Sequence, residues 1–186
     1  SGEALAFAPL DYEQAPPAEI LSAYRSDRAP FAETGSPALP GGLNLGSQLA
    51  WLDTLYPEVM ASATLLPWAQ YWSWFLSGTA SSEATSLGCH SDLWNPRAAD
   101  YSSLARRRGW SDRFAPLAAA GDVAGTLRPS ITAATGLPGT CRVLAAADLR
   151  ASSPAIACPV LLVGGTVDAS TPEDLVRATA AAIKGA

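Results

Sequence analysis

The chain has 186 residues, of which 48% are hydrophobic and 16% are charged. This composition supports one buried core with room for a small second unit, and it excludes a largely disordered chain. The net charge of −5, with no basic cluster larger than residues 106–108, excludes a typical nucleic-acid-binding protein, and no apolar run reaches the roughly 20 residues of a membrane span.

The first half of the chain alternates between short elements and proline breaks. Residues 4–10 are apolar and predict a strand, and Pro17 predicts the start of a helix that reaches Tyr24. Residues 29–45 are rich in proline and glycine and predict a long loop, which inside a domain often lines a site. Apolar residues at helical spacing from Ser47 to Tyr56 predict a helix, followed by a second helical turn over 58–63.

An aromatic segment follows at residues 68–76. Trp68, Tyr71, Trp72 and Phe75 fall on one face of a predicted helix, and Gly78 suits its C-terminal cap. We interpret this stripe as packing of the core. The alternative is an aromatic wall beside a sugar, because aromatic rings pack on the apolar face of a sugar or polyol.

The second half predicts a mixture of strands and helices. Strands are expected over 81–89 and 141–147, and helices over 101–108, ended by Gly109, and 130–135, ended by Gly136. Residues 159–163 form a continuous apolar run, as in a buried parallel strand, and Thr171 and Pro172 begin a helix. Because such a strand needs neighbours, we expect it to pair with residues 81–87 or 141–147.

The cysteines and arginines give two further expectations. Cys89, Cys141 and Cys158 are widely spaced and no C-x-x-C pair occurs, so no metal site is predicted. Reduced thiols in a cytoplasmic protein are the favoured interpretation. The arginines at 106–108 are interpreted as a solvated helix end.

The run Thr85-Ser86-Leu87-Gly88-Cys89-His90-Ser91-Asp92-Leu93-Trp94-Asn95-Pro96 resembles the FGGY carbohydrate kinases, in particular their rhamnulokinase-like branch. Supporting strings occur at 10–13, 40–49 and 134–138, and the resemblance covers about residues 3–145. It implies the first lobe of an actin-like, RNase H-like kinase, which holds a ketose or deoxy-sugar while a second lobe holds ATP.

Phosphoryl transfer needs a phosphate-binding turn, a divalent metal and a base. The resemblance implies ATP and Mg²⁺ as cofactors, but we expect the phosphate-binding turn and the ATP-binding lobe to lie outside these residues. The family's base follows a histidine and precedes Ser-Asn. Asp148 lies near that place but lacks both neighbours, which argues against it as the base. We therefore expect no kinase turnover from this chain alone, and its catalytic residues remain unknown.

Four residues are candidates for binding a sugar: Gln70, His90, Asp92 and Trp94. The imidazole of His90 can donate a hydrogen bond to a sugar hydroxyl or accept one, and the carboxylate of Asp92 can accept one. The alternative is that His90 and Asp92 form a structural pair that fixes a loop.

A second resemblance begins near Arg142. Residues 147–150, 156–168 and 171–172 resemble the late part of an α/β-hydrolase of the enol-lactonase type, in which Asp168 occupies the place of the triad acid. In that fold the order is Ser, Asp, His. The single histidine, His90, precedes Asp168 and no G-x-S-x-G motif occurs, so a polar turn residue is the favoured interpretation of Asp168.

These observations predict a mixed α/β fold. Residues 1–145 are expected to form a partial actin-like, RNase H-like sugar-kinase lobe, and residues 146–186 an appended hydrolase-like strand and helix. The leading hypothesis for function is a sugar-kinase-derived lobe, inactive alone. The rivals are an α/β-hydrolase-related protein and a non-catalytic protein that binds sugar or assembles. Unpaired sheet edges and an uncovered core would favour self-association.

Overall fold

The computed structural model describes residues 5–119, 121–139, 142–144, 177–178 and 180–181. The chain divides into two compact units, Ser1–Ala146 and Ala147–Ala186. In the second unit the described residues are helical. The first unit carries the kinase-like motifs. Of the predicted hydrolase-like unit, the described residues 177–178 and 180–181 are helical, within the helix expected from Thr171, and the strand expected at 159–163 lies outside the described residues.

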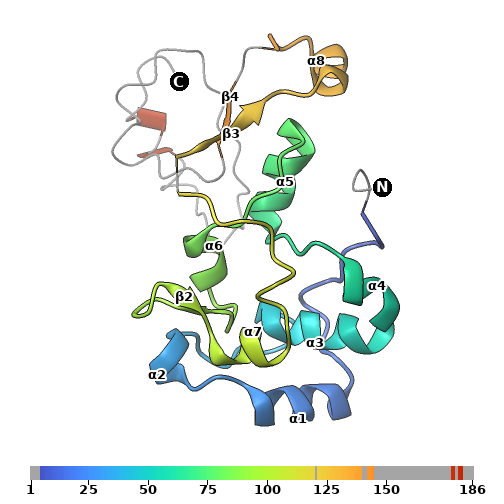
Figure 1. The fold of residues 1–186 in the computed structure, drawn as a ribbon, viewed down its shortest axis with the longest axis vertical. Coiled ribbons are helices and arrows are strands. Elements are labelled where there is room, and N and C mark those ends of the chain that lie inside the picture. The colour runs from blue at the N-terminus through green and yellow to red at the C-terminus, as the bar shows by residue number, and fades with distance from the viewer. Residues whose placement is uncertain (1–4, 120, 140–141, 145–176, 179, 182–186) are drawn as a thin grey trace. The chain divides into compact units, whose positions relative to one another are not determined.

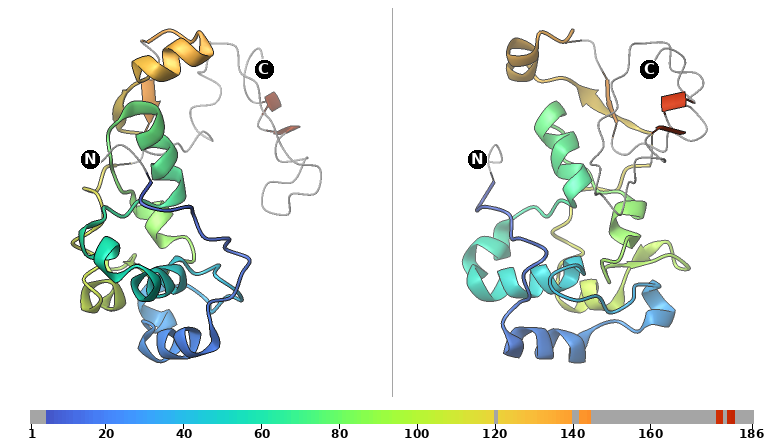
Figure 2. Two further views of the ribbon diagram at one scale, coloured as in Figure 1. Left: turned by 90° about the vertical axis from the view of Figure 1, so that its right-hand side faces the viewer. Right: turned by 180° about the vertical axis from the view of Figure 1, so that it is seen from behind.

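Four helices open the first unit: α1 (Ala18–Asp27), α2 (Phe31–Thr34), α3 (Leu45–Leu55) and α4 (Pro57–Ser62). Helix α1 follows Pro17, and its Glu19 in the first turn and Arg25 in the last suit the helix dipole. Pro57 separates α3 from α4 and begins the latter. Helices α1 and α3 pack together (Figures 1 and 2). Tyr24 on α1 and Leu49 on α3 are buried.

The middle of the unit joins two helices to a short hairpin. Helix α5 (Trp68–Ser77) ends at Gly78, whose φ of 87° only glycine adopts easily. Helix α6 (Ala84–Gly88) begins at Glu83. Strands β1 (Trp94–Asn95) and β2 (Asp100–Tyr101) pair antiparallel, and α7 (Ser103–Arg107) follows, capped by the Ser102 hydroxyl.

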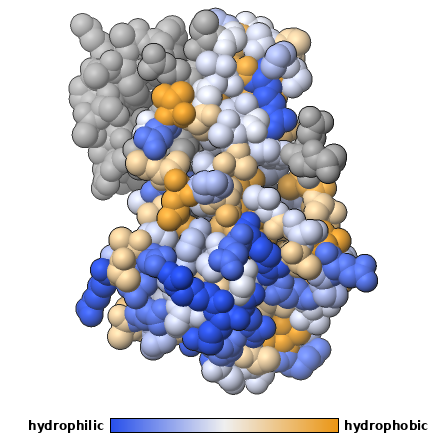
Figure 3. Space-filling view, viewed as in Figure 1, coloured by the Kyte–Doolittle hydropathy of each residue, from blue (hydrophilic) through white to orange (hydrophobic). Residues whose placement is uncertain are grey.

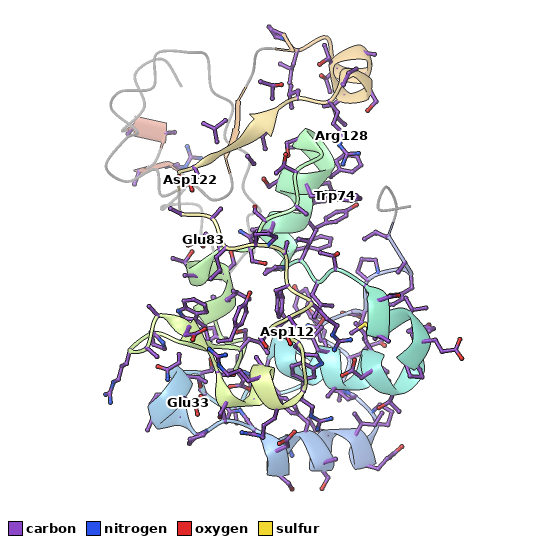
Figure 4. All side chains as sticks on the ribbon, in the orientation of Figure 1. Glu33, Trp74, Glu83, Asp112, Asp122 and Arg128 are labelled. Carbon is purple, nitrogen blue, oxygen red and sulfur yellow. The ribbon has the colours of Figure 1, made fainter. Side chains whose placement is uncertain are left out.

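A second hairpin adjoins the end of α5. Strand β3 (Val123–Thr126) pairs antiparallel with β4 (Arg142–Leu144), and α8 (Pro129–Thr135) connects them. Arg128 lies over the Trp74 ring, with its guanidinium carbon 4.9 Å from the ring centroid (Figure 4). Its Nη2 also donates to the Trp74 carbonyl at 3.0 Å, so Arg128 satisfies an end carbonyl of α5.

The core lies among α1, α3, α4, α6, α7 and the first hairpin. Trp110 is its largest fully buried side chain, and its indole Nε1 donates to Asp53 at 2.7 Å. The other core members are Tyr24, Ala29, Leu49, Ala50, Met60, Leu65, Leu87, Leu93, Trp94, Leu104, Ala105 and Phe114.

Several predicted elements are confirmed. The helices expected from Pro17, Ser47, Glu58, Trp68, Tyr101 and Ser130 occur as α1, α3, α4, α5, α7 and α8. The strand expected over 141–147 is present as β4 within its described residues. Residues 29–45 are mostly loop, as expected, but they contain the short helix α2.

Two predicted strands are wrong. Residues 5–10 contain no strand, and instead the Phe7 ring stacks on Tyr56 with centroids 4.7 Å apart. Residues 84–88 form α6 where a strand was expected over 81–89. The buried carboxylate of Glu83 accepts hydrogen bonds from the backbone of Thr85 and Ser86, which starts a helix there.

The core-packing interpretation of the aromatic stripe is also wrong. Trp68, Trp72 and Phe75 are among the exposed large hydrophobic side chains, whereas Gln70 and Ser73 on the same helix are buried. Helical spacing defined the face correctly. It did not show which face of α5 points away from the rest of the unit.

The arginine cluster is a solvated helix end, as expected. Figure 3 shows hydrophilic side chains gathered over α1 and α7. Arg107 and Arg108 pair with Asp27 at 3.1 and 2.6 Å, and Arg106 pairs with Asp100. Burial opposes ionisation of Asp27, but hydrogen bonds from Arg108 and Arg107 outweigh it and hold its pKa below the usual range. Among the described residues, none of the helices has the length and apolarity needed to cross a bilayer.

Candidate functional site

The predicted sugar-binding residues occupy different environments. His90 is exposed and follows α6, Asp92 is fully buried two residues later, and Trp94 is buried on β1. These three form one continuous segment, whereas Gln70 is buried on α5. His90 is therefore the member of the set whose side chain is open to solvent.

Asp92 is held by two residues from the N-terminal part of the chain. Arg28 donates from Nε to Oδ2 at 2.7 Å and from Nη2 to Oδ1 at 2.8 Å, a two-point pair. The Tyr24 hydroxyl donates to the same Oδ2. Arg28 also donates to the Ser36 carbonyl. The Asp92 carboxylate thus joins α1 to the segment that follows α6.

Burial and charge shift the titration of both partners. Burial raises the pKa of the Tyr24 hydroxyl far above its ordinary value, and the hydrogen bond to Asp92 raises it further. The hydrogen bond to Asp92 also raises the pKa of Arg28, against the opposing effect of burial. Both groups therefore keep their protons, and both donate to one carboxylate.

The backbone around Asp92 adopts an unusual conformation. His90 and Asp92 have φ of 54° and 67°, in the left-handed region that non-glycine residues rarely occupy. Strain of this kind persists only where the surroundings impose it, and it concentrates at functional sites.

Side chains from distant loops impose that conformation. Asn44 Nδ2 donates to the His90 carbonyl at 2.8 Å, and Ser102 Oγ donates to the Asp92 carbonyl at 2.7 Å. The Gly46 amide donates to the Ser91 carbonyl at 2.9 Å. The three consecutive carbonyls are thus each bonded, and the exposed His90 ring projects from a fixed backbone.

Trp94 follows the same segment along the chain and is buried on β1. Its ring meets Tyr101 edge to face, with centroids 5.7 Å apart, across the β1–β2 hairpin. The carbonyl of Leu93 accepts from the Ser102 amide at 2.8 Å. Trp94 therefore anchors the segment in the core.

Sequence analysis missed Tyr24, Arg28, Ser36 and Asn44. Tyr24 and Arg28 are four positions apart at the end of a helix, a spacing that places them on one face. Nothing in the local sequence connects that face to Asp92, because the contacts span 64 and 68 positions.

Two other predicted residues, Asp148 and Asp168, lie outside the described residues. Among the residues the structure describes, His, Cys, Asp and Glu side chains nowhere gather in a group of three able to hold a metal ion. A shallow depression of about 180 Å³ between α1 and α3 is lined by Tyr24 and Arg108, below the roughly 300 Å³ of ordinary ligand pockets.

Comparison with known proteins finds similarity to solved structures of sugar kinases. No protein-family model matches the chain, and no curated protein matches it significantly. Among solved structures, a carbohydrate kinase from Novosphingobium aromaticivorans is 63% identical with a TM-score of 0.73, over 76% of this chain and 31% of the kinase. A xyloylose kinase from Brucella ovis is 24% identical with a TM-score of 0.48, over 68% of this chain and 25% of that kinase.

The first match supports a sugar-kinase origin for the matched part of the chain. The chain spans about a third of the length of that kinase. The identity and TM-score of the second match are too low to support an inference about function. The mixed helix and strand fold matches carbohydrate kinase structure.

Proposed function

We propose that the first unit is the sugar-holding part of a carbohydrate-kinase lobe, of the FGGY type and its rhamnulokinase-like branch. The 63% identity to a solved carbohydrate kinase carries this proposal. The finer assignment rests on residues 85–96 and the supporting strings at 10–13, 40–49 and 134–138. The substrate class is a ketose or a deoxy-sugar.

His90 is the residue that we assign to direct contact with a sugar hydroxyl. His90 is exposed, and hydrogen bonds to the carbonyls of His90, Ser91 and Asp92 fix its backbone. An imidazole on a fixed backbone loses little freedom on binding. In this proposal Asp92 does not contact the sugar, because its carboxylate is already bonded to Arg28 and Tyr24. It instead holds in place the backbone that carries His90. Trp94 and Gln70 are buried supports.

The chain alone is proposed to bind sugar without phosphorylating it. In carbohydrate kinases ATP and Mg²⁺ supply the phosphoryl group and neutralise its charge. The described residues offer no cluster that fits Mg²⁺, so we assign none of them to the metal and derive no transfer step. Asp148 as a weak candidate for the base and Asp168 as a polar turn residue in place of a triad acid are untested, and a cytoplasmic location stays a prediction.

A thermal-shift titration tests the proposal. The full chain is melted with a panel of ketoses, deoxy-sugars and polyols, with and without Mg²⁺ and ATP. A ligand that binds only the folded state raises the melting temperature by mass action. We expect a rise with at least one ketose or deoxy-sugar, and no ADP formation.

The matched variants are His90→Ala and Arg97→Ala, both at exposed positions. His90→Ala is expected to abolish the shift and Arg97→Ala to retain it. No shift with any sugar, or an equal shift in His90→Ala, contradicts the proposed site. Sugar-dependent ADP formation contradicts the absence of turnover.

A further inference from the structure

The loop between α2 and α3 is closed by one buried side chain, Asn44. Asn44 is 3% exposed, and its Oδ1 accepts from the Leu39 amide at 2.9 Å. Its Nδ2 donates to the Pro37 carbonyl at 3.1 Å and to the His90 carbonyl at 2.8 Å. The reversed carboxamide would set its oxygen against two carbonyl oxygens, so the partners fix its orientation. One group thus joins the loop at residues 37–43 to the segment that carries His90.

The same loop also rests on the N-terminal part of the chain. The Gly42 amide donates to the Tyr12 carbonyl at 2.9 Å, and Gln48 Nε2 donates to the Gly42 carbonyl at 2.5 Å. Gly41 has a φ of 59°, and a Cβ there would lie 2.9 Å from the Glu13 carbonyl oxygen. Backbone therefore lies directly on backbone at this contact. The loop is held by the N-terminal segment through its glycines and by the carboxamide that closes it.

The backbone of His90 needs support of this kind. Its φ of 54° is one that a residue other than glycine rarely keeps unless its surroundings impose it. The His90 amide bonds locally, to the Gly88 carbonyl at 3.1 Å, whereas its carbonyl bonds across 46 positions to Asn44. Without the Asn44 donor we expect His90 to relax towards a negative φ, which turns its exposed ring away from its present direction.

We propose that Asn44 is a positioning residue of the sugar site, which couples the loop at residues 37–43 and the N-terminal segment beneath it to the ring of His90. The inference rests on the proposed contact between His90 and the sugar. If only a fraction of the molecules holds His90 in the competent conformation, the apparent affinity falls in proportion to that fraction. A competent fraction of about one tenth weakens sugar binding about tenfold.

Isotope-labelled histidine tests the backbone part of the proposal without any sugar. His90 is the single histidine of the chain, so the label isolates one backbone amide in the NMR spectrum of the full chain. The three-bond coupling between its amide and α protons reports φ, and the parent chain should give the value for a φ near 54°. Asn44→Asp keeps the size of the side chain and an acceptor for Leu39 but loses the donor, so the coupling should move towards that of a negative φ.

The thermal-shift titration tests the binding part. In Asn44→Asp the sugar concentration needed for a given shift should rise about tenfold, with His90 still present. Asn95→Ala is the matched control, because the Asn95 Oδ1 also accepts from local backbone, at the Arg97 and Ala98 amides, both at 3.1 Å. It should keep the His90 coupling and the sugar titration of the parent chain.

A second variant acts on the loop from its other side. Gln48→Ala removes the bond to the Gly42 carbonyl at a half-buried side chain. It should move the His90 coupling in the same direction as Asn44→Asp, by a smaller amount. Melting curves check that each variant is folded, and Gln48→Ala decides the question if Asn44→Asp does not fold.

Three results would overturn the proposal. The first is a folded Asn44→Asp variant with the His90 coupling of the parent chain, and the second is an unchanged coupling in Gln48→Ala when Asn44→Asp does not fold. The third is a changed coupling with unchanged sugar affinity, which would give Asn44 a structural role alone. A parent chain that binds no sugar contradicts the proposed function instead, and the coupling still decides whether Asn44 holds the His90 backbone.

Discussion

Arg28 and Asp92 lie 64 positions apart in the sequence and form a two-point ion pair in which the carboxylate is fully buried. The two N–O distances are 2.7 and 2.8 Å, and the Arg28 side chain is 15% exposed. This pair connects the end of α1 to the strained segment that presents His90. The conformation of that segment should therefore depend on the pair.

Removing Arg28 should destabilise the chain strongly. Arg28→Ala leaves a buried carboxylate without its counter-charge, which typically costs about 3–5 kcal/mol. Arg28→Lys keeps a charge but loses the two-point geometry, so its cost should be smaller. Urea unfolding at neutral pH measures both.

The control for this prediction is Arg106→Ala. Arg106 pairs with Asp100 at the surface, where the side chains are 54% and 46% exposed. Loss of an exposed pair costs about 0–1 kcal/mol. Equal losses in Arg28→Ala and Arg106→Ala would show that the Arg28–Asp92 pair does not hold the fold.

The raised pKa of Tyr24 predicts a loss of stability in alkali. Above about pH 10 the unfolded chain releases the Tyr24 proton while the folded chain keeps it. The unfolded state then binds fewer protons, so the free energy of unfolding falls as pH rises. Below about pH 10 the contribution of Tyr24 is fully present.

Tyr24→Phe should therefore flatten the decline measured by urea unfolding between about pH 8 and 11. It should also cost about 1–3 kcal/mol at pH 7, because it removes a hydrogen bond to a charged group. Part of the decline should remain, since burial also raises the pKa of Tyr101. Tyr12→Phe, at an exposed ring, is the control, and an unchanged slope in Tyr24→Phe would contradict the assignment.

Local signals in the sequence were sufficient to predict most of the helices. Gly78 and Gly136 end α5 and α8 at φ of 87° and 71°, and Pro17 precedes α1, all as their chemistry predicts. The strand predicted over 81–89 failed because the Glu83 side chain caps a helix that begins at Ala84. A buried carboxylate as a helix cap is not recognisable until its burial is known.

Long-range relationships were not predictable from one sequence. His90 and Asp92 were singled out together, yet the residues that hold Asp92 come from α1 and its C-terminal end, 64 and 68 positions away. The prediction that the aromatic face of α5 packs in the core failed for a related reason. Periodicity defines a stripe, but the packing of the whole unit decides whether that stripe is covered.

Gly46 lies so close to its neighbours that a side chain at this position would be crowded. A Cβ there would lie 2.9 Å from the Tyr24 hydroxyl and 3.0 Å from the Ser91 carbonyl, so both would have to move. Gly46→Ala should cost about 1–3 kcal/mol, as overpacking usually does. It should also weaken any sugar binding through His90.

Gly88→Ala is the matched control for Gly46→Ala. Its Cβ would meet Trp94 at 3.6 Å, an ordinary contact, in the last residue of α6. Alanine favours helix over glycine, so stability should hold or rise by up to about 1 kcal/mol. Thermal unfolding ranks the two variants, and a Gly46→Ala variant as stable as Gly88→Ala would contradict the crowding.

Glu83 should be required for α6, the helix that leads into the His90 segment (Figure 4). It is 3% exposed and accepts from the Thr85 and Ser86 amides at 2.9 and 3.2 Å. Glu83→Ala leaves those amides without their acceptor and should cost about 1–2 kcal/mol. Glu83→Gln keeps a side-chain oxygen of the same reach, so it should retain most of the stability. Urea unfolding compares them. A Glu83→Gln variant as unstable as Glu83→Ala would mean that the charge, and not the acceptor geometry, starts this helix.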